Sequence, residues 1–206
     1  MRSRVLLTVC TVILLVSVCF CAVGISAAKN AERTEEAKAS LNTDDEKLVA
    51  ALSVIYAKAG NLMTALPNAT ITLSQTALMK MYAGDTDARA YFDNNLNLYT
   101  QNAFDEMDRI KAEYTAVINK YNGSAYNTKR TELEKMLDNV RSASTELKER
   151  TRALIAASGS DYDAYNAYCD QLQVLTDRLT SYSTKIDAEY TALMQKLLGN
   201  DFNYVS

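Results

Sequence analysis

Residues 161–198 run DYDAYNAYCDQLQVLTDRLTSYSTKIDAEYTALMQKLL, without a proline or a glycine. Apolar residues recur along this stretch at steps of three and four, the spacing of one face of an α-helix. The stretch therefore predicts one long amphipathic helix, capped at its start by Ser160 and Asp161. Its buried seam is expected to consist of Tyr165, Tyr168, Leu172, Leu175, Leu179, Tyr182, Ile186, Tyr190, Leu193 and Leu197.

The same rhythm occurs in two preceding segments, which predict helices over about 86–121 and 125–158, separated by a turn at 122–124. Gly159 suits the left-handed position that often follows a helix. The earlier helix is expected to bury Leu96, Tyr99, Ala103, Met107, Ile110, Tyr114, Val117 and Tyr121. The later one is expected to bury Leu133, Leu137, Val140, Ser144, Leu147, Thr151, Leu154 and Ser158, with Met136, Ala143 and Ile155 beside them.

A further helix is predicted to begin at a capping box, in which Thr43 and Glu46 bind each other's backbone amides. Pro67 is expected to end this helix, because proline lacks the amide hydrogen that a helix interior needs. Residues 67–85 are then a connector that contains a short helix at about 73–83. The inner face of the first part is expected to be Leu48, Leu52, Ile55, Ala59, Leu62 and Leu66.

These segments predict an all-α fold, an elongated antiparallel bundle of four helices with coiled-coil-like spacing, because short turns force neighbouring helices to run antiparallel. Residues 125–158 carry seven basic and five acidic residues, against three and six in 161–198, which favours contact between these two helices. In outline, the bundle resembles the periplasmic four-helix sensor domains of bacterial chemoreceptors, which sit between two membrane spans. No motif accompanies the resemblance, and it implies a fold alone.

Ahead of the bundle, residues 1–28 predict a signal peptide or a transmembrane anchor. Arg2 and Arg4 precede an uncharged run over 5–28, which as a helix would be about 36 Å long, enough to cross a bilayer. Positive charges stay inside, so the remaining chain is expected outside the cytoplasmic membrane, either anchored or secreted. Cleavage after Ala28 and lipidation at Cys19 or Cys21 are both alternatives to a retained anchor.

The remaining chain is divided into a polar helical stalk at 29–42, the bundle domain at 43–200 and a C-terminal tail at 201–206. It carries 20 basic and 25 acidic residues, a poor match for nucleic acid. No histidine occurs, which excludes His-based acid–base catalysis and most zinc-site patterns. Cys169 is the one cysteine after the leader, so an intramolecular disulfide is excluded there. We expect no enzyme activity, cofactor or metal.

The chain has thirteen tyrosines, four phenylalanines and no tryptophan. Several of the tyrosines lie where the connector and the turn before residue 161 are expected to meet. Such residues either close the bundle end as a hydrophobic plug or form an adaptable contact surface. The candidate ligand or partner surface is Met79, Met81, Tyr82, Tyr91, Phe92, Tyr162, Tyr165 and Tyr168. Asn68 and Asn122 begin N-x-[ST] sequences and are candidate glycosylation sites.

Three functions remain open from the sequence. The favoured one is a non-enzymatic binding or sensor-type domain outside the cytoplasmic membrane, with a protein partner or self-association. The second is a structural envelope or surface spacer without a small ligand. The third, and least favoured, is an enzyme that uses carboxylates and tyrosines.

Overall fold

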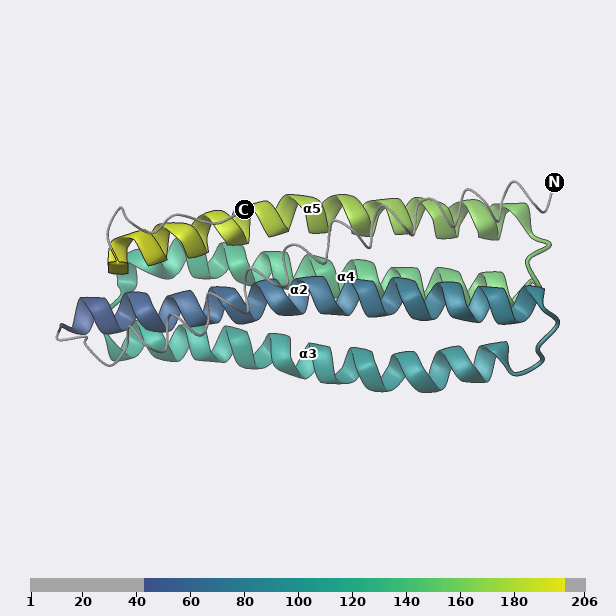
Figure 1. Cartoon of the computed structure of the whole chain (residues 1–206), viewed down its shortest axis with the longest axis horizontal. Coiled ribbons are helices and arrows are strands. Elements are labelled where there is room, and N and C mark those ends of the chain that lie inside the picture. Colours follow the sequence, from purple (N-terminus) through teal and green to yellow (C-terminus); the bar gives the residue numbers. More distant parts are fainter. Residues whose placement is uncertain (1–42, 199–206) are drawn as a thin grey trace.

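The computed structural model describes residues 43–198, which form a bundle of long antiparallel helices with no strand among them (Figure 1). The elements are α2 Asp44–Tyr82, α3 Ala88–Lys120, η1 Ser124–Tyr126, α4 Asn127–Ala156 and α5 Tyr162–Leu198. The predicted all-α bundle is therefore confirmed. The expected leader (1–28), stalk (29–42) and tail (201–206) lie outside the described residues.

Helix α2 is the centre of the packing, because it contacts α3, α4 and α5. Helix α4 lies against it across the diagonal of the bundle, and α3 and α5 fill the two sides. The capping box at Thr43 is present as predicted: the Glu46 amide donates to Thr43 Oγ1 at 3.2 Å, and the Thr43 amide donates to Glu46 Oε2 at 2.9 Å.

Because α2 faces three neighbours, it is apolar over much of its circumference. Among the described helices, it is the one that is long and apolar enough to cross a membrane, and 56% of its most apolar window is buried inside the bundle. Val49, Tyr56 and Met63 join the core here, beside the predicted face of the helix. The predicted Leu62 is partly buried.

Pro67 does not end the first helix, contrary to the prediction from sequence. Helix α2 runs without a break through Pro67 to Tyr82, so the expected connector and separate short helix are its second half. Leu66, Pro67, Thr70 and Ile71 are buried. Proline in a helix interior costs about 3 kcal/mol, and burial of side chains on both sides of Pro67 offsets this locally unfavourable residue.

The core of α4 follows the prediction closely, from Leu133 to Leu154. In α5, Tyr168, Leu175, Leu179, Ile186, Tyr190 and Leu193 are buried as expected, and Tyr165, Leu172, Tyr182 and Leu197 pack partly buried against them. In α3 the prediction is wrong at two places: Tyr99 is 40% exposed and Thr100 is buried in its place, and Ile118 is buried where Val117 was predicted. The Thr100 hydroxyl donates to Leu96 O at 2.8 Å, which satisfies a polar group inside the core.

Helices α2, α3 and α4 end in the same way, with a left-handed residue just after the cap: Gly84, Asn122 and Ser158. At α4, the Gly159 amide donates to Leu154 O and the Ser158 amide to Ile155 O, both at 3.1 Å, which is a Schellman motif. The motif places Ser158, and not Gly159, at the first left-handed position. Helix α4 therefore ends at Ala156, and Ser158 is exposed instead of lying in the predicted seam.

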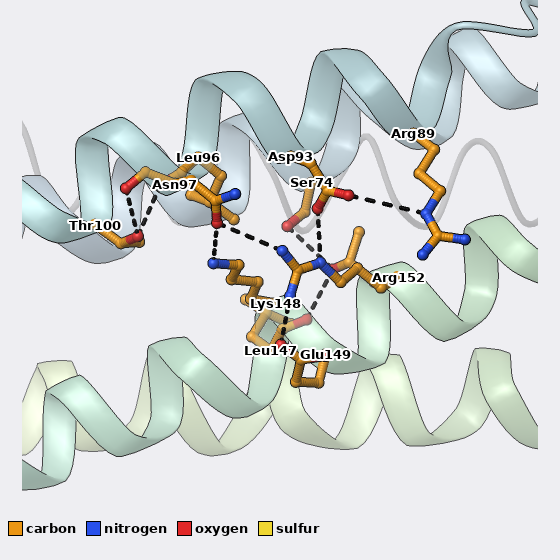
Figure 2. A network of polar contacts seen from close by, with 11 residues as sticks. Ser74, Arg89, Asp93, Leu96, Asn97, Thr100, Leu147, Lys148, Glu149 and Arg152 are labelled. Carbon is orange, nitrogen blue, oxygen red and sulfur yellow. Dashed lines mark hydrogen bonds and ion pairs between the residues drawn. The ribbon is translucent and has the colours of Figure 1, made fainter.

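The predicted contact between α4 and α5 is present, but the basic residues of α4 form their ion pairs to other helices mainly with α3. Arg152 Nε lies 2.6 Å from Asp93 Oδ1, and Lys148 donates to Asn97 (Figure 2). Arg141 binds Asp108 at 2.8 Å farther along the same interface. One ion pair, Lys129–Glu189, joins α4 to α5. The charge totals therefore agree with the helix contact but do not identify the ion pairs, because ion-pair partners depend on register along each helix.

Candidate functional site

The end of the bundle at which α2 and α4 stop and α3 and α5 begin gathers the predicted aromatic and methionine residues (right-hand end of Figure 1). We call this end the tip. Met79, Tyr82 and Tyr162 are 64%, 51% and 75% exposed, and we call these three side chains the tip surface. Partly buried residues of the predicted set pack against the core near them: Met81, Tyr91 and Tyr165.

The two remaining residues of the predicted surface, Phe92 and Tyr168, are core residues. Phe92 is fully buried, and Tyr168 is 1% exposed. They therefore close the bundle end as a plug, while the tip surface lies outside them. The predicted set is thus divided by burial, with Phe92 and Tyr168 in the core and Met79, Tyr82 and Tyr162 exposed.

The loop between α2 and α3 is organised by one carboxylate. Asp85 Oδ2 binds Lys80 Nζ at 2.7 Å, and Asp85 Oδ1 accepts the Asp87 amide at 2.8 Å. The same Lys80 ammonium lies 5.2 Å from the centroid of the Tyr91 ring. The Lys80 ammonium and the Asp87 amide hold the pKa of Asp85 below its usual value, and Asp85 raises the pKa of Lys80. The loop is therefore held in one conformation by an ammonium between a carboxylate and an aromatic ring.

The turn between α4 and α5 forms a seat for Tyr82. Gly159 has a φ of +66°, and a Cβ atom at this position would lie 2.7 Å from Tyr82 Cε1 and 2.8 Å from its hydroxyl. The hydroxyl end of the ring therefore lies directly on the Gly159 backbone, which only a residue without a side chain allows. Tyr82, the last residue of α2, thereby bridges to the start of α5.

Beneath the tip surface, α5 carries a small cluster of weakly acidic groups. Burial, together with the neighbouring Cys169 thiol, raises the pKa of Tyr165 to about 12. Burial also raises the pKa of Cys169, which keeps the thiol neutral and unreactive. The Tyr168 hydroxyl is buried without a hydrogen-bond partner, and burial, with smaller contributions from Cys169, Tyr165 and Tyr82, raises its pKa.

Metal-ligand clusters and cavities are the remaining features by which a site could be recognised. No group of three or more histidine, cysteine or acidic residues that could hold a metal ion occurs within 43–198. A cavity of about 10 Å³ lies between α2 and α5, lined by Gly60, Met63, Thr64, Leu179, Ser183, Ile186 and Asp187. That volume holds about one water molecule and no substrate.

The two candidate glycosylation sites differ sharply. Asn68 lies in the middle of α2, and Thr70, the third residue of its sequence, is fully buried with its hydroxyl bound to Leu66 O at 2.8 Å. Asn122 and Ser124 are exposed at the turn after α3. Only the second sequence is accessible in the folded bundle.

Several residues that shape the tip were not singled out from sequence: Lys80, Asp85 and the seat at Gly159. A signal for the first two was present, because a lysine in a last helical turn commonly pairs with an acidic residue after the helix. The close contact of Tyr82 and Gly159 joins residues far apart in the chain, and no local pattern encodes it.

Comparison with protein families, with curated proteins and with solved structures finds no match for this chain.

Proposed function

We propose that this protein is a non-enzymatic contact domain, held or released outside the cytoplasmic membrane, which binds a protein partner through the tip surface. The observation that carries the proposal is that Met79, Tyr82 and Tyr162 are exposed together at one end of the bundle, whereas the other exposed large apolar side chains, Leu98, Tyr99 and Val174, lie along its length. Large aromatic and methionine side chains contribute much of the energy of protein interfaces.

The way in which the tip surface is held also supports this function. The Tyr82 ring lies against the Gly159 backbone, and the plug residues Phe92 and Tyr168 support the end of the bundle from within. A contact side chain that is already positioned loses less conformational freedom when a partner binds. The tip therefore combines exposed apolar area with a rigid support.

Site-specific photo-cross-linking in the native host tests the proposal. A photoreactive residue at position 162 is expected to give a discrete adduct with a partner. The control carries the same residue at position 119, an exposed site near the opposite end of α3. Identical adduct patterns at both positions, or none at either, contradict the proposal.

A structural spacer is the second candidate, favoured by the long and nearly loop-free shape of the bundle (Figure 1). A spacer transmits distance and needs no contact at its tip, so it predicts no specific adduct at position 162. Both functions place the bundle outside the cytoplasm, a location supported by the charge pattern of residues 1–28. A reporter that is active only in the cytoplasm, fused after Ser206, is expected to give no signal, and a clear signal contradicts this location.

A further inference from the structure

The tip is acidic around its exposed tyrosines. The two segments that form it, 80–89 and 157–163, carry four carboxylates against the two basic residues Lys80 and Arg89. Asp85 is engaged by Lys80, while Asp87 and Asp163 are exposed and have no ion pair among residues 43–198. The free charge beside the tip surface is therefore negative.

An anionic partner is disfavoured at this end, even though two helices begin there. Helix N-termini attract anions through their free amides. At α5 those amides are already taken, because Asp161 Oδ1 accepts the amides of Asp163 and Ala164 at 3.0 Å each. At α3, Asp85 Oδ1 accepts the amide of the N-cap residue Asp87, whose own side chain makes no hydrogen bond to the first turn, so two carboxylates stand at this helix start.

The tip already binds one cation, the Lys80 ammonium, through a carboxylate and an aromatic ring. The Lys80 ammonium lies between the Asp85 carboxylate and the face of the Tyr91 ring. A carboxylate beside an aromatic face attracts a cation by both charge and the ring quadrupole. The same two side-chain types, the tyrosines Tyr82 and Tyr162 and the aspartates Asp87 and Asp163, are exposed on the segments that form the tip.

From these features we infer that the partner of the tip surface presents a basic segment, with a lysine or arginine side chain held between Tyr82, Tyr162 and the carboxylates of Asp87 and Asp163. The inference rests on the proposed contact function and gives the chemistry of its partner. Exposed tyrosine faces supply the apolar and cation–π contact, and the carboxylates supply charge complementarity.

The test uses the full chain in detergent micelles and a labelled oligolysine peptide, with an oligoglutamate peptide of equal length as its opposite. Oligolysine is expected to bind and oligoglutamate is not, as measured by fluorescence anisotropy. D87N/D163N and Y82A/Y162A are each expected to weaken oligolysine binding by about fivefold or more. Raising the salt concentration is expected to weaken it further.

The matched control is D105N/E132Q, which removes two exposed charges away from the tip and is expected to change binding less than twofold. Three results overturn the inference: no binding of oligolysine, equal binding of oligoglutamate, or equal effects of the tip and control variants. If position 162 still gives a partner adduct that D87N/D163N leaves unchanged, the contact function stands and the basic partner is wrong. If position 162 gives no adduct, the contact function itself fails.

Discussion

Replacing Tyr168 with phenylalanine is expected to stabilise the bundle. The side chain is 1% exposed and its hydroxyl has no hydrogen-bond partner. A buried polar group without a partner destabilises a fold by about 1–3 kcal/mol, because it has lost its bonds to water. The substitution keeps the ring and removes only the hydroxyl, which forfeits contacts worth roughly 0.5 kcal/mol. The expected net gain in unfolding free energy is about 1–2 kcal/mol.

The gain in unfolding free energy is measurable by urea unfolding of the full chain in detergent, with circular dichroism as the signal. For a domain of this size each kcal/mol shifts Tm by about 2–4 °C. Tyr182→Phe is the control of opposite sign, because the Tyr182 hydroxyl accepts a bond from Asn139 Nδ2 at 2.8 Å. Its loss is expected to cost about 0.5–1.5 kcal/mol.

The refuting result is that Tyr168→Phe destabilises the protein as much as Tyr182→Phe does. The Tyr168 hydroxyl would then have a bonding partner in solution.

Three further outcomes follow from the structure. Burial raises the pKa of Tyr114 to about 12, above its unfolded value, so its contribution to stability is complete below pH 10 and is lost as pH rises toward 12; urea midpoints from pH 7 to pH 12 should fall only in that window. Gly159→Ala should lower the free energy of unfolding clearly more than Gly84→Ala does. Both glycines have a positive φ, but only at Gly159 would the added Cβ atom clash with a side chain, that of Tyr82. Equal losses in urea unfolding would contradict the close contact between Tyr82 and Gly159. In a secretory host that attaches N-glycans, Asn122→Gln should abolish the mass shift of the folded protein and Asn68→Gln should leave it unchanged.

Periodicity predicted most of this fold, because a bundle buries one continuous stripe on each helix. The stripe of α4 from Leu133 to Leu154 shows how far the rule extends. It fails where burial is shared among several neighbours. Helix α2 touches three helices, so its apolar residues spread around it, and the packing is strong enough to hold Pro67 inside a helix. The rule that proline ends a helix considers only the local sequence, so it does not account for that packing.

The location of the tip followed from connectivity alone, because four antiparallel helices with short turns bring the second and fourth helix starts to one end. Connectivity did not predict which side chains at the tip are exposed. For α5, helix geometry explains the difference. Tyr162, Tyr165 and Tyr168 are three residues apart, and each step of three turns the side chain by about 60° short of a full circle.

The three tyrosines therefore spiral from solvent into the core. Tyr162 is 75% exposed, Tyr165 is partly buried, and Tyr168 is 1% exposed. One helix thus supplies a contact side chain, an intermediate one and an anchor within two turns. A ligand that contacts Tyr162 would be supported by a ring fixed in the core below it, so contact and support are coupled through a single rigid element. Replacing Tyr162 should change binding without unfolding the bundle. Removing the Tyr168 ring should both change binding and destabilise the bundle.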